Sequence, residues 1–472
     1  MLRKIGLKNY KCWQALDIDL APITLFFGSN SSGKTAILQS LLMLKQTARG
    51  FDPKQHINFG GSDRDYVDLG SFFDLVYGHN EQRSICIRFS WDLSHEDIEE
   101  LAVARWVEDK SDKRSLYPSM FMQCDISWEL DSNVFVKRLG YDLFEDGRHE
   151  NRIELAHSHE DRYNLTRYVL DAVAKRSESE HENTSLVAAD KVEVGPPRGA
   201  HFIERGFLLQ VANDHVTTSS DFIGMQLGKL LYELFYLGPL RQYPKRSYLW
   251  TGEEKTHVVE PDGADTIAAI ISSERDDRTL QKQVADCMTK LGLSESFAVR
   301  PVDQNNRFYE AVVTVNGEES ALADVGFGVS QVLPVITMLL SAPEGSIVLL
   351  EQPELHLHPN AQSALADLLL YAAEQRRLQL IVESHSEHLL RRLQRRVAEA
   401  QPAFANPENI KMYFCQTGDA GSSIEEVEID RFGQIANWPE NFLGDISGDL
   451  HKMLKAALER RGQELERVGH RG

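Results

Sequence analysis

The stretch GSNSSGKT, residues 28–35, satisfies the pattern G-x-x-x-x-G-K-[S/T] at every position. The apolar run ITLFFG predicts a buried strand that ends at Gly28, and the apolar side chains of residues 35–50 have helical spacing. In such a loop successive backbone N–H groups face inward around phosphate oxygens, and the helix N-terminus adds partial positive charge. The stretch therefore predicts a P-loop nucleotide site.

Each position of this loop has an expected part in binding. We expect Lys34 to reach the β and γ phosphates and the Thr35 hydroxyl to ligate Mg²⁺. A P-loop alone does not name the reaction, because GTPases, kinases and motors share it. The predicted phosphate-binding residues are Gly28, Asn30, Ser31, Ser32, Gly33, Lys34 and Thr35.

The bulk composition is that of a soluble globular chain. It has 472 residues, 42% of them hydrophobic and 26% charged, and no apolar stretch long enough to span a bilayer, so we expect a cytoplasmic protein without a membrane partner. The net charge of −20 opposes non-specific attraction to nucleic acid, which would need a local basic patch. The candidates are Arg376 with Arg377 and the cluster at residues 391–396, although helix C-terminal charges and a solvated helix face explain them better.

Two later strands end in polar residues. The run SIVLL delivers Glu351, and LQLIVE delivers Ser384 and His385. Because ligands of open α/β sheets bind at the carboxyl ends of the strands, we expect these segments to meet the P-loop. The predicted fold is α/β, with a mainly parallel central sheet covered on both faces and an antiparallel N-terminal element.

The predicted organisation has four parts. Residues 1–90 and 236–400 form the two parts of one P-loop domain, residues 91–235 form a mixed α/β insertion, and residues 401–472 form a C-terminal extension. Within the second part of the head, Asn316-Gly317 predicts a hairpin turn, and Pro359 predicts the start of a helix that ends at Arg376 and Arg377.

Four motifs in order, GSNSSGKT, DVGFGVSQVLP, IVLLEQPELHLHP and IVESHSEHLL, resemble those of the ABC-type ATPases of the SMC, RecF and OLD kind. The segments YLGPLRQYPKRSY (236–248) and GQIANWPENF (433–442) are similar to those of prokaryotic AAA-type ATPases, including the ATPase subunit of the Septu anti-phage system. The resemblance implies a P-loop fold and a homodimer, or a higher homo-oligomer, in which ATP and Mg²⁺ lie between two heads.

The resemblance also assigns site residues. It implies a signature turn at Gly326, Gly328 and Ser330, although the usual Ser-Gly-Gly-Gln order is absent. It implies that Glu351 binds Mg²⁺ and that His385 senses the γ-phosphate. Arg241 is left open between a phosphate contact across the interface and pairing with an acid. His356 and His358 fall in the dimer-contact loop, and a metal site there is disfavoured because further ligands are lacking nearby.

Gln352 stands where the family usually has the carboxylate that polarises the attacking water. An amide can orient a water but cannot accept its proton, so the sequence predicts slow hydrolysis. Glu354, two residues further on, is the alternative acid. The candidate catalytic set is therefore Glu351, Gln352, Glu354 and His385.

Three functions are compatible with these residues. The first is a dimeric ATPase that works in prokaryotic anti-phage defence or in DNA repair and recombination, with nucleic acid as a candidate partner. The second is an ATP-gated platform with little hydrolysis, to which a separate effector such as an HNH nuclease or a toxin binds. The third, a nuclease within this chain, is disfavoured because the residues after His385 lack the spaced acidic clusters of a metal-dependent nuclease.

Overall fold

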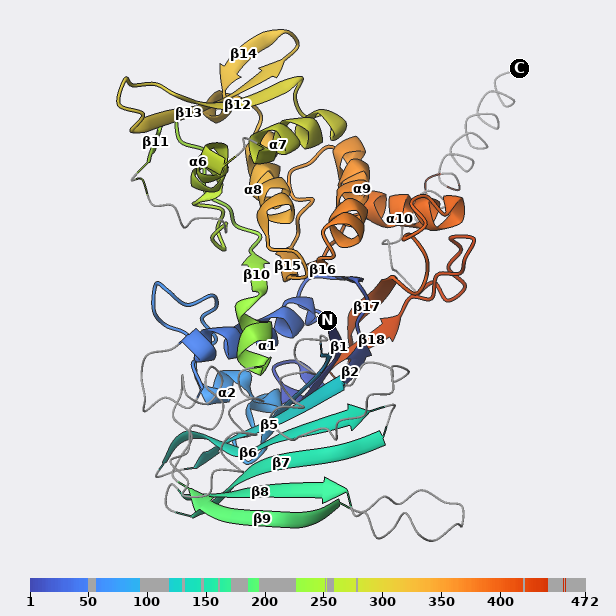
Figure 1. Cartoon of the computed structure of the whole chain (residues 1–472). Helices are drawn as coiled ribbons and strands as arrows, with labels where there is room; N and C mark the ends of the chain where they lie inside the picture. The colour runs from blue at the N-terminus through green and yellow to red at the C-terminus, as the bar shows by residue number, and fades with distance from the viewer. Residues whose placement is uncertain are drawn as a thin grey trace, which may run out of the picture.

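The fold comes from a computed structural model of the whole chain (Figure 1). The structure describes residues 1–49, 57–93, 119–129, 132–145, 148–159, 162–170, 186–194, 226–250, 252, 259–276, 279–418, 421–439, 453 and 455.

A six-stranded sheet forms the centre of the molecule. From β10 to β17 all neighbours are parallel, and β18 closes the edge antiparallel to β17. Strands β15 and β16 are buried at every residue, as expected of parallel strands covered on both faces. The strands in spatial order are β10 (Leu234–Leu237), β15 (Ile347–Glu351), β16 (Gln379–Glu383), β3 (Ile23–Gly28), β17 (Ile410–Gly418) and β18 (Gly421–Glu426).

Side chains of the central strands alternate between two hydrophobic cores. Ile23, Leu25 and Phe27 pack into one core, whereas Phe26 packs into the other. The first core is covered by helices α8 (Phe327–Ser341), α9 (Pro359–Gln375) and α10 (Glu387–Glu399). The second contains helix α1 (Lys34–Arg49) and the antiparallel sheet (Figure 1). The predicted α/β fold with a mainly parallel central sheet is confirmed.

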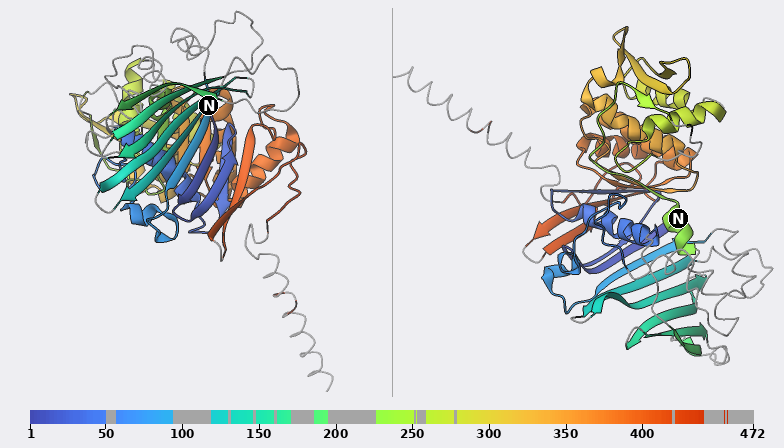
Figure 2. Two further views of the ribbon diagram at one scale, coloured as in Figure 1. Left: turned by 90° about the horizontal axis from the view of Figure 1, so that it is seen from below. Right: turned by 90° about the vertical axis from the view of Figure 1, so that its left-hand side faces the viewer.

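An eight-stranded antiparallel sheet lies on the α1 side of the molecule (Figure 2). It begins with the predicted N-terminal pair, which is confirmed, and grows strand by strand through the segment predicted to be a mixed insertion. The described residues of 91–235 form strands β5 to β9 and a helical stretch at 226–232. The strands in order are β2 (Trp13–Asp19), β1 (Leu2–Tyr10), β4 (Ile85–Asp92), β5 (Ser119–Glu129), β6 (Ser132–Glu145), β7 (Arg148–His159), β8 (Arg162–Leu170) and β9 (Leu186–Val194).

A small lobe packs on α8, at the end of the molecule opposite the antiparallel sheet (Figure 1, top). Its helices are α6 (Thr266–Asp276) and α7 (Thr279–Lys290), and its strands are β11 (Tyr248–Leu249), β12 (Ser296–Pro301), β13 (Phe308–Val315) and β14 (Glu318–Ala321). Val315 pairs with Glu318 across the predicted Asn316-Gly317 hairpin turn. Short helical turns complete the described elements at α2 (Phe72–Leu75), η1 (Tyr77–His79) and η3 (Leu322–Asp324).

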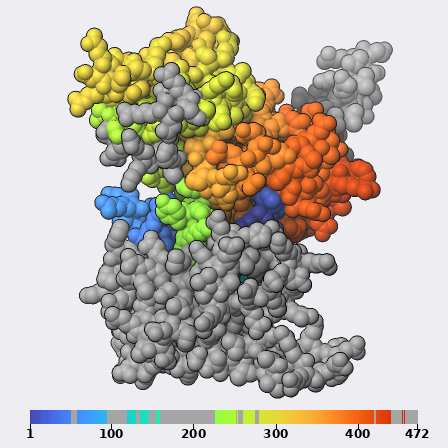
Figure 3. Space-filling view, in the orientation of Figure 1, coloured from blue at the N-terminus to red at the C-terminus, as the bar shows by residue number. Residues whose placement is uncertain are grey.

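The space-filling view shows the lobe and the C-terminal helices as one continuous surface, with a small area of N-terminal residues at its base (Figure 3). Within the described ranges, every helix is too short or too polar to cross a bilayer.

Candidate functional site

The P-loop turns tightly between β3 and α1. Gly28 has φ +137°, and a Cβ there would lie 2.0 Å from the Cys415 carbonyl oxygen on neighbouring β17. Gly33 has φ +98°, and its Cβ would meet the Cys12 sulfur at 2.6 Å. Both positions therefore require glycine, because any side chain would be strained and would collide. Helix α1 begins directly after the loop, at Lys34.

Lys34 is 3% exposed and its ammonium group is held inside the loop. Its Nζ donates to the carbonyl oxygens of Gly28 at 3.1 Å and Ser29 at 2.7 Å. Burial lowers its pKa, and the nearby Glu383 carboxylate opposes that shift. A phosphate group could replace both carbonyl contacts with stronger, charge-assisted hydrogen bonds.

A cavity of about 490 Å³ opens over the loop. It is lined by residues from four distant segments of chain, namely Lys11, Cys12, Asn30, Ser31, Ser32, Gly33, Lys34, Thr35, Ala36, Gln352 and Glu383. Within it, the Ser32 hydroxyl is buried and has no hydrogen-bond partner. A buried polar atom without a partner is costly, so this hydroxyl is poised for a ligand.

Glu383 is a site residue that the sequence interpretation missed. It ends β16, which lies between β15 and β3, so the strand register sets Glu383 beside both Glu351 and Phe26. Its Oε2 accepts a hydrogen bond from Thr35 Oγ1 at 2.8 Å, and its Oε1 lies 3.9 Å from Lys34 Nζ. The signal was present, since Glu383 ends an apolar strand just as Glu351 does.

Glu351 lies one strand further from the P-loop than Glu383. It is buried, and its Oε1 accepts a hydrogen bond from the Tyr236 hydroxyl at 3.0 Å. Burial and the neighbouring Glu383 charge raise the pKa of Glu351 to about 7, against the effect of the Tyr236 hydrogen bond. Two carboxylates on adjacent strands thus share a poorly solvated region, which favours a cation between them.

Gln352 lines the cavity opposite the P-loop in an unfavourable backbone conformation. Its φ of +45° lies in the left-handed region, where a residue with a side chain carries strain. The backbone N–H of Gln352 donates to the Glu383 carbonyl at 2.8 Å, which fixes the turn after β15. Gln352 therefore lines the cavity from a turn that is tied to the end of β16.

Glu354 and His385 lie next to each other, and neither is among the residues that line the cavity. Glu354 Oε1 accepts a hydrogen bond from the His385 backbone N–H at 2.7 Å, and burial raises the Glu354 pKa. The His385 ring contacts Gly28 of the P-loop; desolvation and the Lys34 charge lower its pKa, while a hydrogen bond to the Gly28 backbone raises it. Glu354 thus connects the turn after β15 to the turn after β16.

Arg241 lies near the buried acid Glu354, and its hydrogen bonds go to backbone carbonyl oxygens. It is buried, and its guanidinium donates to the carbonyl oxygens of Gln331 at 3.2 Å, Glu351 at 3.0 Å and Gln352 at 3.3 Å. These contacts tie the end of β15 to α8. Arg241 is therefore a positioning residue for the turn that carries Gln352.

The predicted signature residues lie at the start of α8 and do not line the P-loop cavity. Gly326 caps the helix at the surface. A Cβ on Gly328 would lie 2.5 Å from the His356 carbonyl oxygen, so that glycine permits close packing on the turn after β15. The Ser330 hydroxyl donates to the Phe327 carbonyl at 2.8 Å. The exposed Phe327 ring packs against His356, with ring centroids 4.7 Å apart.

The two histidines of the HLH segment both have contacts within the chain. His358 is the N-cap of α9, where its Nδ1 accepts from the Asn360 backbone N–H at 3.4 Å. His356 has φ +65° and packs on Phe327. The described part of the chain contains no group of three or more His, Cys, Asp or Glu side chains able to hold a metal ion.

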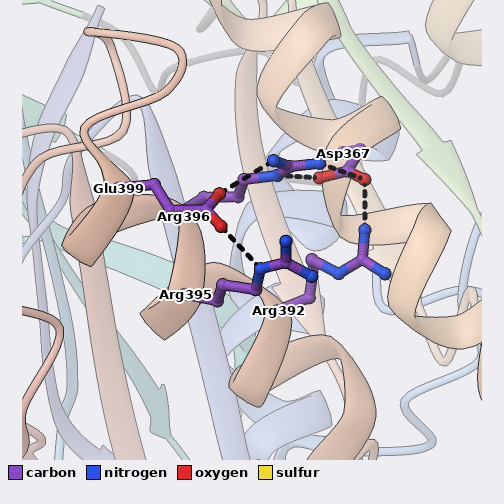
Figure 4. Close-up of polar contacts among 5 residues, drawn as sticks. All are labelled: Asp367, Arg392, Arg395, Arg396 and Glu399. Atoms are coloured by element: carbon purple, nitrogen blue, oxygen red, sulfur yellow. Dashed lines mark hydrogen bonds and ion pairs between the residues drawn. The ribbon is translucent and has the colours of Figure 1, made fainter.

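The arginine cluster of α10 is neutralised by acidic partners (Figure 4). Asp367 of α9 binds both Arg392 and Arg396, each at 2.7 Å, and Glu399 binds Arg395 and Arg396. Arg391 pairs with Glu387. These residues hold α10 against α9, which agrees with a structural interpretation of the cluster better than with a phosphate-binding patch.

Two ATPase families match separate parts of the chain. The family described as "AAA ATPase domain" matches residues 1–193, and the one described as "AAA domain, putative AbiEii toxin, Type IV TA system" matches residues 244–391. A third family, "Protein of unknown function (DUF3696)", matches residues 405–453.

An OLD nuclease from Thermus scotoductus is 33% identical over 82 residues, which are 16% of this chain and 15% of that protein. The chain therefore matches only a small part of the nuclease. An SMC head bound to the C-winged helix domain of ScpA gives a TM-score of 0.42 at 10% identity, covering 91% of this chain and 98% of that one. The SMC head domain from Thermotoga maritima gives 0.39 at 11% identity, covering 91% and 99%.

Proposed function

We propose that the chain is an ATPase of the AAA type, in the group that includes OLD, RecF and SMC proteins, and that ATP binding joins two copies of it head to head. In this proposal the P-loop of one copy and the signature turn of the other enclose the triphosphate. ATP binding, rather than its hydrolysis, is the event that changes the assembly.

One observation carries the proposal. The P-loop cavity is lined by Lys34, Ser32, Gln352 and Glu383, whereas Gly326 and Phe327 lie at the surface, outside that cavity. A single copy therefore offers a phosphate site that is open on one side. A second copy could close it with the backbone N–H groups at the start of α8.

The residues suit Mg²⁺ and ATP. The cavity presents hydroxyl and carboxylate oxygens, which Mg²⁺ prefers, next to an ammonium group and inward-facing amides for phosphates. When bound, Mg²⁺ offsets negative charge on the phosphates. Lys34 would hold the β and γ phosphates, and Gln352 would orient the attacking water. Thr35 would hold the metal together with Glu351, which ends the strand next to Glu383 but is not among the residues that line the cavity.

Hydrolysis is slow in this proposal. The amide of Gln352 can hold a water by hydrogen bonds, but a proton must leave to another group. Glu354, the alternative acid, is already bonded to the His385 backbone N–H and lies outside the cavity lining. The joined heads consequently persist for many seconds, and Gln352 sets that lifetime.

We further propose that the joined heads hold a separate effector in a prokaryotic anti-phage complex, as the Septu-like motifs at 236–248 and 433–442 suggest. The similarity to an OLD nuclease is consistent with such a setting. In this proposal the effector is a second protein, because the residues after His385 lack the spaced acidic clusters of a metal-dependent nuclease.

Mass measurement by light scattering tests the head-to-head proposal. We expect the mass of the protein to double with the slowly hydrolysed analogue ATPγS and Mg²⁺ and to return to its starting value after nucleotide removal. With ATP in place of ATPγS, phosphate release should be slow but measurable. An unchanged mass at saturating nucleotide refutes the proposal, while a doubled mass with no phosphate release favours an ATP-gated platform.

A further inference from the structure

Glu383 contacts the two P-loop residues that matter most for a nucleotide with its metal. Thr35 donates its hydroxyl hydrogen to Glu383 Oε2 at 2.8 Å, and Lys34 Nζ lies 3.9 Å from Glu383 Oε1. Because the Thr35 hydrogen is engaged, both lone pairs of its oxygen are free to face the cavity. Glu383 thus orients Thr35 as a ligand for a cation.

A bound phosphate would leave the buried carboxylates near the P-loop with an excess of negative charge. Among the buried acids, Glu354 lies near Arg241 and Glu383 lies near Lys34, while Glu351 has the neutral Tyr236 hydroxyl. A phosphate would draw the Lys34 ammonium away from Glu383. Glu383 would then face both the phosphate and Glu351, and a cation between them would relieve this repulsion.

A second observation points independently to a ligand at this place. The Ser32 hydroxyl is 0% exposed, lacks a hydrogen-bond partner and lines the same cavity as Glu383 and Thr35. The cavity therefore contains an unsatisfied buried oxygen on the loop side and a carboxylate on the β16 side. A hydrated divalent cation bound to a phosphate could satisfy both.

We propose that Glu383 is the second carboxylate of the Mg²⁺ site, placed on β16 between the P-loop strand and Glu351, and that it holds Thr35 and the metal's water. This inference rests on the proposed ATP site. It differs from the sequence-based assignment, in which Glu351 alone supplies the carboxylate, because Thr35 bonds to Glu383. Glu383 acts on the reaction through Thr35 and the cation and is thus a positioning residue.

Mn²⁺ binding measured by electron paramagnetic resonance tests the assignment, with ATPγS bound and Mn²⁺ in place of Mg²⁺. Glu383→Gln keeps the size of the side chain and an acceptor oxygen for Thr35 but removes the charge. We expect Mn²⁺ affinity to fall about 10- to 100-fold, the range seen when groups that support a metal site are removed. ATPγS binding in EDTA should stay the same or become tighter, because a negative charge near the phosphates is gone.

Two further variants complete the design. Glu344→Gln makes the same charge change at an exposed position and should leave both affinities unchanged. Glu383→Asp keeps the charge on a shorter side chain and should lose less Mn²⁺ affinity; it also carries the test if Glu383→Gln does not fold. Unchanged Mn²⁺ affinity, or an equal loss of ATPγS binding in EDTA, overturns the assignment. If the wild-type protein binds no ATPγS, the proposed function itself fails.

Discussion

The P-loop cavity and the signature turn are built in opposite ways. The cavity brings together four segments of one chain around a buried lysine and an unsatisfied hydroxyl. The signature turn lies at the surface. Gly328 packs closely on the His356 carbonyl oxygen, and Asp324, which comes just before the turn, forms an ion pair with Arg246. In the proposed function, the first region needs only a ligand, whereas the second needs another copy of the chain. Nucleotide binding should therefore depend on the cavity alone, and turnover on both regions.

The largest effect is expected from Lys34→Ala. Removing a buried ammonium from the phosphate site should weaken ATP binding at least about 30-fold, because such charged contacts are worth about 2–5 kcal/mol. Calorimetry with Mg²⁺ and ATP measures this change. Lys45→Met is the matched control, since Lys45 is buried in the same helix but donates to the Leu231 carbonyl, away from the cavity. Retained ATP affinity in Lys34→Ala would contradict the assignment of the cavity.

Gln352→Glu should have the next largest effect, in the opposite direction. A carboxylate at this position can accept the proton of the attacking water, so phosphate release should rise about 10- to 100-fold, toward the usual contribution of a general base. ATP affinity should change little. The backbone strain at φ +45° is similar for both residues, so it cannot explain a difference. Equal rates for the wild type and Gln352→Glu would show that the base lies elsewhere, and Gln352→Ala provides the comparison without a polar group.

Gly328→Ala tests the signature turn with a smaller expected effect. The new methyl group would lie 2.5 Å from the His356 carbonyl oxygen and would displace the start of α8. We expect phosphate release to fall about tenfold, which corresponds to about 1.4 kcal/mol, while ATP affinity stays within about twofold. Gly326→Ala is the control for folding, because its methyl group meets no atom within 4 Å and its φ is −54°. A parallel loss of ATP affinity in Gly328→Ala would mean that the two regions are not separable.

The sequence alone was sufficient to predict the features that are set by residues close together in the chain. The P-loop, the strand before it and α1 follow from one glycine-rich motif between two apolar patterns, and Asn316-Gly317 forms the predicted hairpin turn. A local sequence pattern could still predict a helix cap two residues away from its position in the structure. Ser384 and Glu387 have the spacing of a helix capping box, but Ser386 caps α10 and accepts from the Leu389 backbone N–H.

Features that depend on strand order could not be derived from the sequence. Glu383 enters the cavity because β16 lies between β15 and β3, and no local pattern encodes that order. Arg241 and Tyr236 reach the end of β15 from residues more than 100 positions away. The strands of 119–194 extend the N-terminal sheet by pairing in sequence order, while their polar composition suggested a separate mixed insertion. The assigned roles of the site residues remain predictions.

The smallest effect concerns the far end of α1 and tests whether that end is independent of the cavity. Burial, together with the Arg49 charge, lowers the pKa of Lys45 to about 7 from its ordinary 10.5. Between these values the unfolded chain binds more protons than the folded one, so the free energy of unfolding contributed by Lys45 rises with pH. The expected gain is about 1 kcal/mol from pH 7.5 to 8.5.

Chemical unfolding of the wild type and Lys45→Met at several pH values measures this contribution. It is the difference between the two free energies of unfolding, in which the effects of other titrating groups cancel. The hydrogen bond to the Leu231 carbonyl is lost in the variant at every pH and adds only a constant offset. The wild type should therefore gain stability relative to Lys45→Met as pH rises above 7, while ATP affinity shows no matching trend. A difference that is flat with pH would place the ammonium of Lys45 in contact with water, and an ATP affinity that follows it would show that the two ends of α1 are coupled.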